Sequence, residues 1–87
     1  MPGRTDQPAL TPEVAREVDA TGLSCPMPVI ELAKAVAGLE VGQVVGLTAT
    51  DPAAQVDVPV WCRMQRHALL EARKAEGAWR FLIRRAR

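Results

Sequence analysis

The chain has very few aromatic side chains and no tyrosine. Trp61, Trp79 and Phe81 are the only three, about 3% of the 87 residues. This scarcity argues against the stacking platforms on which single-stranded nucleic acids bind. The charge balance points the same way, because 11 basic and 10 acidic residues leave a net charge of +1. No general electrostatic attraction supports a nucleic-acid partner, and we expect no direct contact with nucleic acid.

The chain also lacks long apolar runs and has only two cysteines, Cys25 and Cys62. No run is long enough to span a membrane, and residues 1–12 contain no hydrophobic signal-peptide core. We therefore expect a cytoplasmic protein with no membrane partner, in which reducing conditions keep both thiols free. With His67 the cysteines are three potential metal ligands, but their spacing is not typical of a zinc site. We expect no bound metal and, since the chain shows no cofactor fingerprint, no cofactor.

Length and composition predict one folded domain behind a short leader. Hydrophobic residues make up 48% of the chain, which favours a folded core over disorder. Residues 1–13 contain three prolines and a glycine but few apolar side chains, a composition typical of a flexible leader. We expect residues 14–87 to form the domain and to act as a monomer.

The first half of the domain predicts a strand, a helix and a second strand. Residues 16–20 favour a short strand, with Val14 and Val18 as candidate inward residues. Residues 26–39 favour a helix, because apolar side chains recur there at spacings of three and four. Residues 44–50 are apolar and β-branched, which is typical of a buried strand. The apolar stripe of the predicted helix consists of Val29, Leu32, Ala33, Val36 and Leu39.

A second helix is expected over residues 53–65. Its sequence places Val56, Val60 and Met64 on one face. Pro59 lies well past the first turn, so we expect it to kink this helix or to break it into two segments.

The last part of the chain is ambiguous by local rules. Residues 68–74 have helical propensity, but Glu76-Gly77 signals a turn and residues 79–83 favour a strand, so a hairpin is the alternative. With the hairpin, the order of elements is strand, helix, strand, helix and two strands. This order predicts a two-layer α/β sandwich with two helices on one face of a four-stranded sheet.

The segment from Gly22 to Pro28 holds the leading candidate for chemistry, because Cys25 directly precedes Pro26 at the predicted start of the first helix. Proline suits the first helical position, which would make Cys25 the N-cap. The free amides and the helix dipole would then favour a thiolate, a good nucleophile and sulfur acceptor. The alternative is a small apolar side chain that only caps the helix.

Other polar residues have mainly structural interpretations. Cys62 is expected to pack in the core, and a resolving role would require it to lie near Cys25. His67 is expected to close the second helix, with a role as proton donor as the alternative. Asp51 precedes Pro52 and is expected to cap the same helix. The basic cluster of Arg84, Arg85 and Arg87 is expected to be a solvated tail, or an aid in docking an acidic partner.

The chain resembles the TusA-like sulfur carriers, also called the SirA-like family. The resemblance begins at residues 19–28, where Cys25-Pro26-Met27-Pro28 matches the family's Cys-Pro-x-Pro signature behind an upstream Asp19 and Gly22. It continues through residues 51–53 and 57–59 to Cys62, His67 and residues 79–84, and so covers most of the chain. Two departures stand out, because Val56 replaces an arginine common in relatives and Met27 replaces the glutamate of some.

The resemblance implies a β-α-β-α-β-β sandwich with a mixed sheet, in which residues 68–75 form a strand. It further implies that Cys25 carries sulfur as a persulfide, with Asp19, Gly22, Pro26, Met27 and Pro28 supporting the site loop. The donor would be a cysteine desulfurase or a rhodanese-type sulfurtransferase, and the acceptor a further carrier such as a DsrE-like protein. The pathways implied are tRNA thiolation, molybdenum-cofactor maturation and sulfur oxidation. The chain would act as a relay carrier rather than as a stand-alone sulfurtransferase enzyme.

Two other classes of function remain open at this point. A regulatory or RNA- or protein-binding module of the same fold would use the C-terminal arginines and transfer no sulfur. A redox protein would cycle a disulfide between Cys25 and Cys62. Neither explains the prolines around Cys25.

Overall fold

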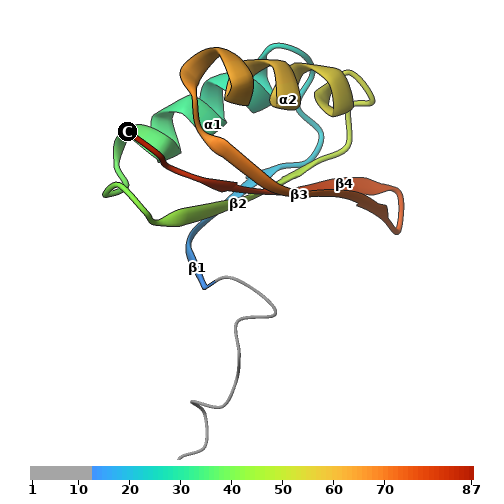
Figure 1. The fold of residues 1–87 in the computed structure, drawn as a ribbon. Coiled ribbons are helices and arrows are strands. Elements are labelled where there is room, and N and C mark those ends of the chain that lie inside the picture. The colour runs from blue at the N-terminus through green and yellow to red at the C-terminus, as the bar shows by residue number, and fades with distance from the viewer. Residues whose placement is uncertain (1–12) are drawn as a thin grey trace, which may run out of the picture.

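Four strands form one sheet, and two helices lie together on one of its faces (Figure 1). The structure is a computed structural model that describes residues 13–87, so nearly all of the predicted leader lies outside the described residues. The elements in chain order are β1 (Val14–Ala20), α1 (Met27–Ala37), β2 (Val44–Ala49), α2 (Ala54–Gln65), β3 (Ala68–Ala75) and β4 (Ala78–Arg84).

The strand order across the sheet is β1-β2-β4-β3. β1 pairs parallel with β2, whereas β4 pairs antiparallel with both β2 and β3. The predicted two-layer sandwich with a mixed sheet is therefore confirmed. The core lies between the sheet and the helices. Its side chains come from both layers and include Leu32, Val36, Val45, Leu47, Val58, Cys62, Phe81 and Ile83.

The predicted apolar stripe of α1 is largely confirmed. Leu32 and Val36 are buried, Leu39 is buried just beyond the end of the helix, and Val29 packs against the core. The helix ends where the amide of Gly38 donates to the carbonyl of Ala35. Spacings of three and four predict the buried residues of α1 correctly because only one face of this helix packs on the sheet.

The observed bounds of α2 agree with the predicted 53–65 to within one residue. It is a single helix that contains Pro59, so of the two predicted effects of this proline, a kink or a break, the break does not occur. A proline removes one backbone hydrogen bond, and the burial of Ala54, Val58 and Cys62 on one face of the helix offsets that loss. The face that carries Val56, Val60 and Met64 is turned to solvent, with exposed fractions of 60%, 42% and 71%.

The ambiguous segment is a strand. β3 and β4 form a hairpin around Glu76 and Gly77, whose φ angles of 52° and 81° are those of a tight turn with two left-handed residues. Pairing with β4 satisfies the backbone groups along one side of β3, and this tertiary pairing outweighs the helical propensity of its alanines and charged residues. Glu71 and Arg73 lie on the same side and form an ion pair.

The parallel pairing of β1 and β2 positions the candidate site. Parallel strands end at the same edge of a sheet, so the loops that follow β1 and β2 lie next to each other. Both helices start from this edge and run toward the opposite end, where the C-terminus lies (Figure 1).

Candidate functional site

Cys25 lies in the loop between β1 and α1, and its side chain is an exposed free thiol. It is not the N-cap that the sequence predicted. α1 begins at Met27 with Pro26 as its N-cap, and the Met27 amide donates to the carbonyl of Ser24 at 2.8 Å. Cys25 therefore sits one residue further from the helix, in the preceding turn, where the N-terminal dipole acts on it less directly.

Asp19 and Gly22 shape the loop in front of the cysteine. One carboxylate oxygen of Asp19 accepts from the amide and the hydroxyl of Thr21, at 3.0 and 2.7 Å, and these bonds lower the pKa of Asp19. Gly22 has a φ of 81°, which favours glycine, and its amide donates to the hydroxyl of Thr50 at 2.8 Å. The geometry is consistent with the loop-forming roles expected for both residues.

Asp51 links the two loops at the sheet edge. Its Oδ2 accepts from the amide of Cys25 at 2.7 Å and its Oδ1 accepts from the amide of Ala53 at 3.0 Å. These two backbone bonds lower the pKa of the carboxyl group. The expectation that Asp51 is simply the cap of α2 needs correction, because the N-cap residue is Ala53 and the other oxygen of Asp51 holds the backbone of the cysteine.

Asp57, in the first turn of α2, contacts the sulfur itself. The thiol of Cys25 donates to Oδ2 of Asp57 across 3.0 Å. This hydrogen bond, followed by desolvation and by the negative charges of Asp57 and Asp51, raises the pKa of the Cys25 thiol above its ordinary value. This direction is opposite to the effect that was expected from the helix dipole.

The role of Asp57 was not predicted from the sequence, although a signal for it was present. Cys25 follows the first strand and Asp57 lies in the first turn of the helix after the second. If the two strands are parallel neighbours, the start of each following helix lies at the same edge of the sheet. The strand pairing would have brought the two residues together.

The two prolines and Met27 differ in exposure. Pro26 is exposed, Pro28 is buried at the second position of α1, and Met27 has 39% of its surface exposed. Ile30 is exposed to 40% on the same helix. The start of α1 therefore offers apolar contacts near the cysteine.

Cys62 is buried, as predicted, with 2% of its surface exposed. It lies on the face of α2 that packs on the sheet, and its burial raises the pKa of its thiol to about 11. Cys25 is exposed, and the structure records both cysteines as free. The geometry thus distinguishes an accessible thiol from an inert one.

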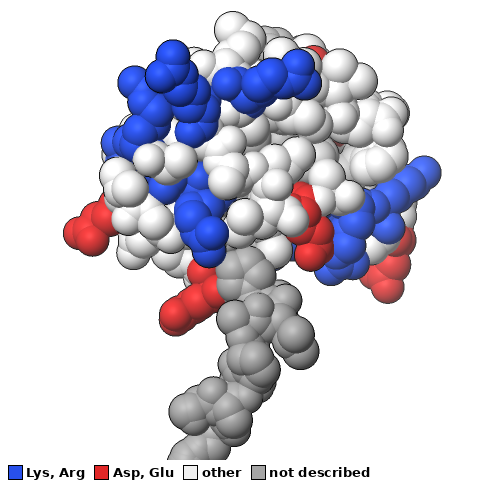
Figure 2. All heavy atoms as spheres, in the orientation of Figure 1, with Lys and Arg blue, Asp and Glu red and all other residues white. Residues whose placement is uncertain are grey.

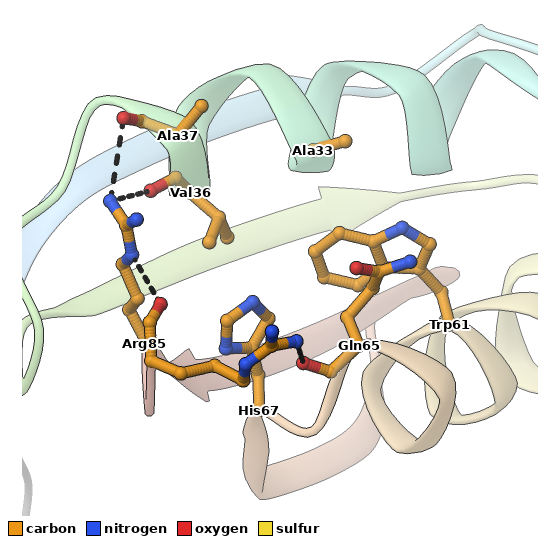
Figure 3. Close-up of a pocket in the computed structure, with 8 residues that line it drawn as sticks. Ala33, Val36, Ala37, Trp61, Gln65, His67 and Arg85 are labelled. Atoms are coloured by element: carbon orange, nitrogen blue, oxygen red, sulfur yellow. Dashed lines mark hydrogen bonds between the residues drawn. The ribbon is translucent and has the colours of Figure 1, made fainter.

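His67 lies just beyond the C-terminal end of α2 (Figure 3), whereas Asp57 lies in the first turn of that helix. Its ring stands 5.6 Å from that of Trp61, and its Nδ1 accepts from the amide of Ala86 at 3.1 Å. Burial and the positive charges of Arg85 and Arg87 lower its pKa. The length of α2 separates His67 from Cys25, whose sulfur contacts Asp57 in the first turn of that helix. The structure does not bring together these two candidate residues.

The C-terminal arginines are not a free tail. Arg85 donates to the carbonyls of Val36, Ala37 and Leu39 at the end of α1, and Arg87 donates to the carbonyl of Gln65 at the end of α2 (Figure 3). Guanidinium groups there satisfy carbonyls that a helix end leaves unpaired. They border a groove of about 480 Å³, and basic side chains gather on this side of the molecule (Figure 2).

Among residues 13–87, no three histidine, cysteine or acidic side chains gather in an arrangement that could hold a metal ion. In the same part of the chain, no helix has the length and apolar character that crossing a membrane requires.

The fold and the site define a small α/β-sandwich domain that presents one accessible thiol in the loop before its first helix. A SirA-like protein from Desulfitobacterium hafniense has this fold, with a TM-score of 0.73 and 27% identity over 83% of this chain and 99% of its own. A family model described as Sulfurtransferase TusA matches residues 16–85, and the chain belongs to the TusA family.

Two curated relatives extend this finding. A protein of Archaeoglobus fulgidus, named as a proposed sulfur carrier, is 37% identical over 68 residues, which cover 78% of this chain and 93% of the relative. A protein of Neisseria meningitidis serogroup A with the same description is 36% identical over 66 residues, which cover 76% of this chain and 89% of the relative.

Proposed function

We propose that this protein is a sulfur carrier that holds sulfur as a persulfide on Cys25. The observation that carries the proposal is the exposed thiol in a loop whose backbone is fixed by Asp51, in a chain of the TusA family. The names of the curated relatives support the same role.

The transfer is an exchange of one sulfur atom between two thiols. The Cys25 sulfur attacks the outer sulfur of a donor persulfide, the donor S–S bond breaks, and the donor thiol leaves. The balance is R–S–SH plus Cys25–SH giving R–SH plus Cys25–S–SH, so no external oxidant or reductant is required. Discharge to an acceptor thiol follows the same chemistry in the opposite sense, and neither step needs a metal or a cofactor.

The donor in this proposal is a cysteine desulfurase or a rhodanese-type sulfurtransferase, each of which presents a persulfide on an enzyme cysteine. The acceptor is a further carrier, such as a DsrE-like protein, that leads to tRNA thiolation, molybdenum-cofactor maturation or sulfur oxidation. Apolar side chains around the loop, Met27 and Ile30 on α1 and Val56 on α2, are exposed and suit contact with such partners.

The alternative of a nucleic-acid-binding module has less support than the carrier. It relies on Arg84, Arg85 and Arg87, but the side chains of Arg85 and Arg87 already bind helix carbonyls. The nucleic-acid-binding alternative would regain support if the protein bound RNA in a salt-dependent way and replacement of Arg84 alone abolished that binding.

Intact mass spectrometry tests the carrier role. The wild type, Cys25→Ser and Cys62→Ala are incubated with a cysteine desulfurase plus cysteine and, separately, with a rhodanese plus thiosulfate. Gain of one sulfur that reductant removes is expected for the wild type and Cys62→Ala but not for Cys25→Ser. No gain with either donor, or gain that persists in Cys25→Ser, contradicts the proposal.

A further inference from the structure

Cys25 contacts two carboxylates, one at its sulfur and one at its backbone amide. Asp57 of α2 accepts a hydrogen bond from the thiol at 3.0 Å, and Asp51 of the loop before α2 binds the amide of the same residue at 2.7 Å. No acidic residue lies in the first turn of α1, and among residues 13–87 the charges that act on the thiol are those of these two carboxylates. None of the ion pairs among residues 13–87 involves either of them.

An exposed cysteine in this setting differs from an activated one. Reactive cysteines lie beside cations or helix N-termini, which stabilise the thiolate. Here a carboxylate without an ion-pair partner occupies the position next to the sulfur, and a hydrogen bond from S–H to a carboxylate exists only while the thiol keeps its proton. Loss of that proton would break the bond and place two negative charges about 3 Å apart.

We propose that Asp57 is a positioning and specificity-determining residue that keeps Cys25 as an unreactive thiol in the free protein. Small electrophiles, oxidants and low-molecular-weight persulfides react with thiolates, so the carboxylate suppresses these side reactions. We further infer that this suppression restricts sulfur exchange to docked protein partners, which rests on the proposed carrier function. The effect of Asp57 on the reactivity of the thiol does not depend on that function.

The pH profile of alkylation by iodoacetamide tests the role of Asp57. Iodoacetamide is neutral, so its approach is not altered by the charge of the variant. The profile is recorded from pH 6 to pH 11 in a Cys62→Ala background for the unmodified site, for Asp57→Asn, and for Glu31→Gln as the matched control. Glu31 is a carboxylate on α1 that pairs with Lys34 rather than with the cysteine.

The expected result for Asp57→Asn is a midpoint displaced to lower pH and faster alkylation at pH 7. Each unit of decrease in pKa raises the thiolate fraction about tenfold, and the lower nucleophilicity of a less basic thiolate leaves a net gain of about threefold. Glu31→Gln is expected to superpose on the unmodified site. A profile for Asp57→Asn that superposes on the unmodified site or moves to higher pH overturns the proposal.

A second comparison needs no substitution at the site and so does not depend on the folding of Asp57→Asn. The alkylation midpoint of Cys25 is measured in the native protein and in the same protein unfolded in urea. The native midpoint is expected at higher pH than the unfolded one, and an equal or lower native midpoint contradicts the proposal. Because neither experiment uses a sulfur donor, each can succeed even if sulfur loading fails.

Discussion

The sulfur of Cys25 contacts a carboxylate directly, whereas the helix that follows begins two residues later. A helix N-terminus favours an anion by about 0.3–1 kcal/mol at an exposed position, and the effect falls off within one turn. Asp57 is in direct contact with the sulfur, at 3.0 Å, and acts in the opposite direction. The thiol is therefore accessible to a partner, and the contact with Asp57 raises its pKa.

Replacement of Asp51 is expected to release the backbone of Cys25. In Asp51→Ala the amides of Cys25 and Ala53 lose their acceptor, so the amide of Cys25 should exchange with solvent faster and the melting temperature should fall by a few degrees. Amide hydrogen exchange followed by NMR measures the first effect. The amide of Gly22, which bonds Thr50 instead, is the internal control and should keep its protection. Unchanged exchange at Cys25 would contradict this assignment of Asp51.

Sequence reasoning identified the residues of the site that act locally. Asp19, Gly22 and Cys25 lie within seven consecutive positions, and the preference of glycine for a left-handed turn is a local property. Asp57 is 32 residues from Cys25, and their contact depends on which strands pair and in which direction. Local rules carry no information about that pairing, so they could not show that a carboxylate contacts the thiol and raises its pKa.

The two helices show where periodicity succeeds and where it does not. The apolar stripe of α1 includes the large side chain of Leu32, which is fully buried against the sheet. On α2 two faces carry apolar residues, and the sheet covers the face with Ala54, Val58 and Cys62 rather than the face with Val56, Val60 and Met64. Spacing alone does not distinguish two apolar faces, and the sequence also offered no measure of how well packing tolerates Pro59.

At the C-terminal end of α2, one residue has a left-handed backbone conformation that glycine adopts more easily than other residues. Arg66 has a φ of 63°, in the left-handed region where an L side chain is disfavoured. Arg66→Gly is therefore expected to raise the free energy of unfolding by about 0.5–1 kcal/mol, as measured by urea denaturation. Arg63→Gly, within the last turn of the same helix, is the matched control and should lower it by about 1 kcal/mol. Destabilisation by Arg66→Gly would contradict the strain inferred at this residue.

At the scale of the whole molecule, polar contacts connect the helices to the C-terminal segment and the strands of the sheet to one another. Arg85 and Arg87 connect the C-terminus to the ends of both helices. On the open face of the sheet, Arg80 of β4 passes over Gly46 of β2 and binds both carboxylate oxygens of Glu17 on β1, each at 2.7 Å. A single ion pair thus spans three strands.

The Glu17–Arg80 pair predicts a specific loss of stability in acid. The hydrogen bond to Arg80 lowers the pKa of Glu17 below its ordinary 4.5, so the folded protein binds fewer protons than the unfolded chain in that range. The contribution of the ion pair to the free energy of unfolding is complete above pH 4.5. It disappears as the pH falls through the lower pKa that Glu17 has in the folded protein. Because Glu17 is more than half exposed, the effect is small.

Thermal melts of the wild type and Glu17→Gln between pH 7 and pH 2 test this prediction. The difference in melting temperature should be present at pH 7 and should vanish at the acid end. Glu40→Gln, in the exposed loop after α1, is the control and should melt like the wild type throughout. A difference in melting temperature between the wild type and Glu17→Gln that grows as the pH falls would contradict this prediction.

The central claim is that sulfur is carried on Cys25 and on no other residue, and peptide mapping of the loaded wild-type protein tests it most directly. Trypsin cleaves after Arg16, Lys34 and Arg63, so the peptide of residues 17–34 contains only Cys25 and that of residues 35–63 only Cys62. After loading and alkylation, the account predicts one extra sulfur atom on the first peptide and none on the second. Extra sulfur on the second peptide, or on both in similar amounts, would contradict it.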